Sequence, residues 1–127
     1  TLYEAYAKPV DSKLHMLREI GNRLKGQDIV IFGCGKWGRF FHNLSICKDY
    51  GQVLAYCDNQ CEDGVVQGLA VMKPEAAVIR YPKAVFVIAN KFHADEMRVQ
   101  LGLLGIREDH ILEYSVGTDL FLLRKAI

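Results

Sequence analysis

The sequence predicts a doubly wound α/β fold with a mostly parallel sheet of about five strands, and three observations support it. Short apolar runs alternate with helical patterns along the chain. Within the strand expected at 28–32, residues 29–32 are all apolar, as in a central parallel strand that is buried on both faces. Strands joined through helices form right-handed crossovers. These rules predict the strand order 3-2-1-4-5, with extra helices at both ends of the chain.

Each element has its own local signals. The spacing of Leu14, Leu17, Ile20 and Leu24 predicts a helix over 11–25, and Gly26 is suited to end it. A helix over 36–48 follows the first strand, and Pro74 suits the first turn of a helix over 74–79. The remaining expected elements are strands at 52–57, 69–72, 84–89 and 111–114, a polar loop at 58–64, and helices at 92–104 and 118–126.

Length and composition restrict the function classes. The 127 residues form one domain by size, divided into an N-terminal helical segment (1–26) and the main domain (27–127). Sixteen basic and fifteen acidic residues leave a net charge of +1, which argues against nucleic acid or an anionic membrane as the partner. No apolar run approaches the roughly 20 residues of a membrane span, and no signal peptide is evident.

Four cysteines are too few for a secreted disulfide scaffold of this length, so we expect reduced thiols and a cytoplasmic protein. The chain begins at Thr1 and ends in a helical pattern, so we expect a fragment of a larger protein, covalently attached to another domain. Self-association through the terminal helices is compatible with the sequence.

The glycine-rich stretch after the first strand predicts the ligand class. Gly33, Gly35 and Gly38 form G-x-G-x-x-G between a strand and a helix, the arrangement that brings a pyrophosphate onto a helix N-terminus. Asp58 follows about twenty residues later, where a carboxylate would meet ribose hydroxyls. Arg39 and Phe40 occupy the positions where a P-loop requires lysine and a hydroxyl, so hydrolysis of ATP or GTP is not expected.

Ligands of such sheets lie where the strand order reverses, here between the first and fourth strands. We therefore expect the nucleotide site to be lined by Gly33, Cys34, Gly35, Lys36, Trp37, Gly38, Asp58, Asn59, Asn90 and His93. A carboxylate repels a 2′-phosphate, so Asp58 favours NAD over NADP. Two alternatives stay open: the glycines serve only tight packing in a decayed site, and Asp58 is only a turn or capping residue.

Other chemistry is less well supported. Cys34, Cys57, Cys61 and His93 lack the spacing of known zinc sites, so no metal is predicted and buried reduced thiols are the default. Lys91 and His93 lie where a catalytic group could lie, but His93 has no evident partner. The Tyr-x-x-x-Lys pair of short-chain dehydrogenases is absent, so no catalytic residue is assigned.

The succession of motifs resembles a family. The glycine loop, residues 55–59 (AYCDN), residues 68–76 (GLAVMKPEA) and residues 100–106 (QLGLLGI) are similar to the Rossmann-type NAD(P)- or nucleotide-sugar-binding domains of bacterial polysaccharide and sugar biosynthesis proteins. Such domains are found on sugar acetyltransferases, polysaccharide-biosynthesis dehydratases, FkbM-type methyltransferases and glycosyltransferases. Two positions depart from the family pattern: Cys34 replaces the usual alanine or serine, and Ala70 replaces the usual proline.

The resemblance implies a module that holds NAD or a nucleotide-sugar and has little or no catalysis by itself. One alternative is part of an NAD-dependent oxidoreductase or dehydratase, or of a methyltransferase, completed by a missing domain. Another is a degenerate scaffold domain.

Overall fold

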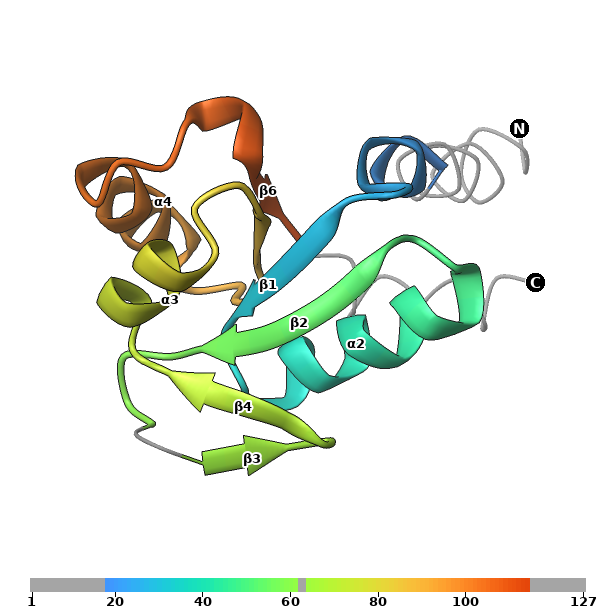
Figure 1. Ribbon diagram of the computed structural model, residues 1–127, viewed down its shortest axis with the longest axis horizontal. Helices are drawn as coiled ribbons and strands as arrows, with labels where there is room; N and C mark the ends of the chain where they lie inside the picture. Colours follow the sequence, from blue (N-terminus) through green and yellow to red (C-terminus); the bar gives the residue numbers. More distant parts are fainter. Residues whose placement is uncertain (1–17, 62–63, 115–127) are drawn as a thin grey trace, which may run out of the picture.

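A computed structural model describes residues 18–61 and 64–114. Residues 18–24 are helical and lead into the central strand. The elements that follow are shown in Figure 1: β1 (Asp28–Phe32), α2 (Lys36–Lys48), β2 (Gln52–Cys57), β3 (Gly64–Val66), β4 (Leu69–Met72), α3 (Pro74–Arg80), β5 (Val85–Ile88), α4 (Ala94–Leu103), the short 3-10 helix η2 (Glu108–His110) and β6 (Ile111–Glu113).

The sheet has six strands in the order β3-β4-β2-β1-β5-β6. All neighbouring pairs are parallel except β3 with β4. The predicted order 3-2-1-4-5 is therefore confirmed for the five expected strands. The strand order reverses at β1, because β2 and β5 lie on its two sides, which places the switch point between β1 and β5 as expected.

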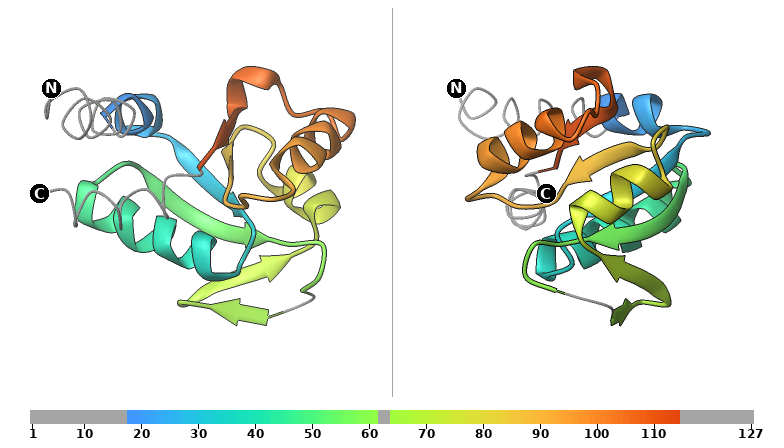
Figure 2. Two further views of the ribbon diagram at one scale, coloured as in Figure 1. Left: turned by 180° about the vertical axis from the view of Figure 1, so that it is seen from behind. Right: turned by 60° about the vertical axis from the view of Figure 1, so that its left-hand side comes forward.

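Helices cover both faces of the sheet. Figure 2 shows α2 on one face and α3 and α4 on the other. The alternation of β1 side chains explains this arrangement, since Ile29 and Ile31 pack in one core cluster with Phe41 of α2. Val30 and Phe32 pack in a second cluster with residues of α3 and α4. Among the described residues, no helix is long and apolar enough to cross a membrane.

The sheet has one strand more than the five or so expected, because β3 begins at Gly64, the last residue of the predicted polar loop. β3 pairs antiparallel with β4 across a two-residue turn. Gln67 and Gly68 have φ of 50° and 80°, as a type I′ hairpin turn requires. This pairing protects the outer edge of β4.

Helix α4 begins at Ala94, two residues later than predicted. The Asn90 side chain explains the delay, because its Oδ1 accepts hydrogen bonds from the backbone N–H groups of Phe92 and His93, both at 2.9 Å. The predicted helix over 118–126 and the first part of that over 11–25 lie outside the described residues.

Candidate functional site

The loops that leave β1, β2 and β5 surround a crevice at the switch point. Its volume is about 290 Å³. The lining comes from all three loops and from α4, and it comprises Phe32, Gly33, Asp58, Asn59, Gln60, Asn90, His93, Glu96, Met97 and Gln100. Half of the ten predicted site residues are in this lining. Cys34, Gly35, Lys36, Trp37 and Gly38 lie next to it, in the glycine loop and the first turn of α2.

A larger hollow of about 490 Å³ lies elsewhere. It is bordered by Arg18, Gly21, Asn22, Lys25, Lys48, Asp49 and Tyr50. These residues lie in or just after the first described helix and at or just after the end of α2, and none follows the carboxyl end of a strand. We therefore place the functional site in the crevice, where the sheet topology and the glycine loop coincide.

The three glycines of the loop have three different surroundings. Gly33 has a φ of 115°, and a Cβ there would lie 3.0 Å from the backbone oxygen of Ala89. A Cβ on Gly38 would lie 1.8 Å from the backbone oxygen of Gly33, so only glycine lets α2 approach β1 this closely. Gly35 has nothing within 4 Å of an added Cβ. The absence of a side chain at Gly35 thus leaves space that the protein itself does not fill.

The first turn of α2 faces this space without a side-chain cap. Gly35 is the N-cap residue, and neither it nor an acidic residue in the first turn satisfies the N–H groups there. Lys36 adds a positive charge, and its Nζ lies 5.4 Å from the centre of the Trp37 ring. Free N–H groups and the positive end of the helix dipole attract anions such as a phosphate.

Asp58 is held by the glycine loop. Its Oδ2 accepts a hydrogen bond from the Cys34 backbone N–H at 3.0 Å, and its Oδ1 accepts one from the Gln60 N–H at 2.7 Å. Burial acts to raise the pKa of Asp58, but the hydrogen bonds outweigh it, so the pKa lies below the ordinary 3.8. The carboxylate is therefore ionised at neutral pH.

Asn59 and Gln100 join the two sides of the crevice. Their side-chain amides exchange two hydrogen bonds, both at 2.9 Å, between the loop after β2 and helix α4. Gln100 is a site residue that sequence reasoning missed. Gln100 lies one helical turn from Met97, on the face of α4 that lines the crevice. This placement is visible only in the structure.

His93 lines the crevice, and its contact with a carboxylate is long and exposed. Its Nδ1 lies 3.8 Å from a carboxylate oxygen of Glu96, and the two side chains are 63% and 81% exposed. Such an exposed pair contributes little to orienting an imidazole.

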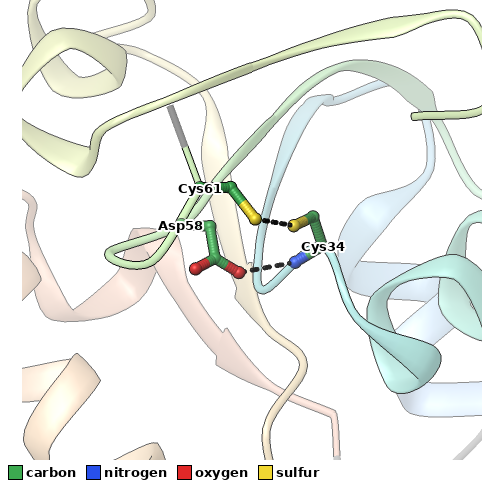
Figure 3. A group of neighbouring side chains, drawn as sticks. All are labelled: Cys34, Asp58 and Cys61. Carbon is green, nitrogen blue, oxygen red and sulfur yellow. Dashed lines mark hydrogen bonds between the residues drawn. The ribbon is translucent and has the colours of Figure 1, made fainter. Parts of the chain in front are cut away.

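Sequence reasoning rejected a metal site made of Cys34, Cys57, Cys61 and His93. The structure instead brings Cys34 and Cys61 together with Asp58, within 4.8 Å of one another (Figure 3). The two sulfur atoms are 3.0 Å apart. Burial, the hydrogen bond with Cys61 and the nearby Asp58 carboxylate raise the pKa of the Cys34 thiol to about 12.

The other two cysteines lie apart from this group. Cys57 is buried, and burial raises its pKa, whereas Cys47 is exposed. The expectation of buried thiols therefore holds for Cys57 and is only partly met by the half-buried Cys34 and Cys61.

Comparison with known proteins shows the fold. No protein-family model and no curated protein matches this chain. A Rex-family repressor, RSP, is similar in structure with a TM-score of 0.58 and 16% identity, covering 90% of this chain and 65% of that chain. UDP-D-quinovosamine 4-dehydrogenase from Vibrio fischeri has a TM-score of 0.60 and 16% identity, covering 78% of this chain and 86% of that chain.

The repressor RSP is also known in complex with β-NADH, and with β-NAD+ and operator DNA. This chain spans less than two thirds of the repressor in the DNA complex, 62% of its length, at 16% identity. DNA binding is therefore a property of that repressor alone, and the absence of a nucleic-acid partner stays a prediction for this chain. At these identities the likeness establishes a Rossmann-type fold.

Proposed function

We propose that this domain is a nucleotide-binding module whose ligand is NAD. One observation carries the proposal: three glycines of one loop each meet a different steric requirement of a dinucleotide site. Gly33 makes the tight turn, Gly38 permits close packing of helix on strand, and Gly35 leaves open space beside a helix N-terminus. A loop that served packing alone would need Gly33 and Gly38 but would not need Gly35.

Asp58 supports NAD over NADP. Its ionised carboxylate stands at the end of β2 and lines the crevice, where it would accept hydrogen bonds from a ribose diol. A 2′-phosphate in that place would meet a like charge. The Cys34 N–H fixes the carboxylate before any ligand arrives, so little ordering is needed on binding.

The size of the crevice limits what enters without rearrangement. A volume of about 290 Å³ is at the lower end of ligand pockets, which span roughly 300–1,000 Å³. This suits one nucleotide half better than a whole dinucleotide. The amide pair of Asn59 and Gln100 would have to part for the second half to lie along the crevice.

The finer assignment follows from the resemblance of the sequence to sugar and polysaccharide biosynthesis domains. We propose that the module belongs to such a protein, with a nucleotide-sugar as the alternative ligand and with catalysis supplied by an attached domain. The V. fischeri neighbour, named as a dehydrogenase of a UDP-sugar, is compatible with this reading. Sequencing the open reading frame around this chain tests whether a catalytic domain is attached to it.

Isothermal titration calorimetry of the chain with NAD+, NADH, NADP+, UDP-sugars and S-adenosylmethionine tests the ligand. We expect binding of NAD+ or NADH, and affinity for NADP+ lower by about tenfold or more, equivalent to about 1.4 kcal/mol. Preference for a UDP-sugar would support the alternative ligand. Heat from none of the compounds would contradict the proposal and favour a scaffold domain.

A further inference from the structure

Cys34, Asp58 and Cys61 offer three metal-ligating atoms from two loops that the chain brings together. Cys34 follows β1, and Asp58 and Cys61 follow β2. Figure 3 shows the two sulfur atoms pointing at each other, with the Asp58 carboxylate beside them. All three residues are half-buried, and one ligand atom from each lies within 4.8 Å of the others.

The donor set selects the class of cation. Two thiolates and one carboxylate are ligands for Zn²⁺ and its relatives, whereas Mg²⁺ and Ca²⁺ take oxygen ligands almost exclusively. Three protein ligands leave the fourth tetrahedral position for water, as in zinc sites that are not purely structural. The group therefore resembles an open site rather than a closed zinc knuckle.

The carboxylate is already oriented for this role. The backbone N–H of Cys34 donates to Oδ2 and that of Gln60 donates to Oδ1, so both carboxylate oxygens are held in place. Hydrogen bonds of this kind hold ligands in place at metal sites and contribute to affinity. The residue that supplies one sulfur thus also positions the oxygen ligand.

The sulfur spacing requires only a small adjustment. With Zn–S bonds of about 2.3 Å, two sulfurs of a tetrahedral site lie about 3.8 Å apart. The observed separation is 3.0 Å, held by a thiol hydrogen bond between Cys34 and Cys61. A cation that replaced the thiol protons would move the two sulfurs apart by less than about 1 Å. Cys61 lies in a loop between β2 and β3, not inside a strand, and can accommodate that shift.

We propose that Cys34, Asp58 and Cys61 bind a thiophilic divalent cation of the Zn²⁺ class, with one open coordination position. Binding replaces the two thiol protons by one cation and releases them to solvent, and no electron transfer is involved. The inference rests on the contacts among these three side chains, and because a cation and a ribose diol would both use the Asp58 carboxylate, the metal titration is made without nucleotide.

Titration of the reduced, chelator-treated chain with Co²⁺ tests the site, because cobalt replaces zinc in tetrahedral sites and its bonds to thiolate absorb in the near ultraviolet. We expect a thiolate-to-cobalt band that saturates at one equivalent and is displaced by Zn²⁺ but not by Mg²⁺. The variants C61S and D58N should lower cobalt affinity, C61S by at least about 100-fold. C47S is the matched control, since Cys47 is exposed and outside the group, and it should bind as the parent does.

Three results would overturn the inference: no charge-transfer band in the parent, a band that C61S leaves unchanged, or a band that C47S abolishes. Mass analysis without reductant separates the rival chemistry. A disulfide between Cys34 and Cys61, combined with no cobalt binding by the reduced chain, would assign the pair to redox chemistry instead. Circular dichroism of each variant shows whether a lost band reflects a lost ligand or a lost fold.

Discussion

The backbone N–H of Cys34 donates a hydrogen bond to Asp58 Oδ2 at 3.0 Å, across 24 residues of sequence. This contact ties the loop after β1 to the loop after β2. It places the acidic residue expected to bind ribose against the loop expected to bind phosphate. The glycine loop and Asp58 therefore form one unit, and a substitution in either alters the other.

Replacing Asp58 by asparagine tests this unit in the absence of ligand. An asparagine side chain has one acceptor oxygen, so it can satisfy Cys34 N–H or Gln60 N–H but not both with equal geometry. We expect D58N to lower the free energy of unfolding by about 1 kcal/mol near neutral pH, measured by urea denaturation. An unchanged value would show that the carboxylate contributes nothing to the loop.

The same variant has a predicted pH dependence. The folded-state pKa of Asp58 lies below its ordinary value, so ionised Asp58 stabilises the fold above pH of about 4. That stability is lost as the pH falls through the folded-state pKa, because protonated Asp58 no longer accepts both hydrogen bonds. Urea denaturation should thus show the parent and D58N converging below pH of about 4. A constant difference down to acid pH would contradict this assignment.

Two glycine substitutions should have opposite effects on stability. In G38A the new Cβ would lie 1.8 Å from the backbone oxygen of Gly33, so we expect loss of more than about 3 kcal/mol or failure to fold. In G102A the Cβ meets nothing within 4 Å, in the exposed last turn of α4, so we expect a gain of up to about 0.5 kcal/mol. Thermal denaturation of both variants measures the contrast, and similar behaviour of the two would contradict the packing assigned to Gly38.

Two buried tyrosines offer a second matched pair. The Tyr56 hydroxyl donates to Gln67 Oε1 at 3.1 Å and lies 3.0 Å from His42 Nδ1, so Y56F should cost about 1 kcal/mol. The Tyr114 hydroxyl is buried without a partner in the described part of the chain, so Y114F should leave stability unchanged or raise it. Denaturant midpoints compare the two, and a larger loss of stability in Y114F than in Y56F would reverse the assignment.

The amide pair across the crevice should affect ligand affinity. If Asn59 and Gln100 must part to admit a dinucleotide, then Q100A removes two hydrogen bonds that the ligand would otherwise displace. We expect NAD affinity to rise by about two- to tenfold, corresponding to up to about 1.4 kcal/mol. Calorimetry measures the change. A fall in affinity would mean that Gln100 contacts the ligand directly.

The sequence predicts the layout of the sheet well because buried parallel strands leave a strong signal. β1 and β2 are apolar runs bounded by turn residues, and their observed limits coincide with the predicted 28–32 and 52–57. β3 escapes because three residues, Gly64–Val66, carry too little pattern. The Gln67-Gly68 turn could have indicated β3, but it predicts a hairpin only when both flanking segments are already identified as strands.

Part of the candidate site could also be predicted from the sequence, and part could not. Topology alone places the glycine loop and Asp58 at one edge of the sheet, and the structure brings them there. Topology cannot place Cys61, because its contact with Cys34 spans 27 residues and depends on the path of a polar loop. The Asn59 to Gln100 pair spans 41 residues, so local patterns contain no trace of it.

The most direct test of the account compares NAD affinity in G35V with that in G102V by calorimetry. Both added side chains start in open space, so both variants should fold, which circular dichroism checks. Only Gly35 faces the proposed phosphate position, so G35V should lose at least about tenfold in affinity, or about 1.4 kcal/mol, while G102V should match the parent. Equal NAD binding by G35V and the parent would contradict the proposed nucleotide site.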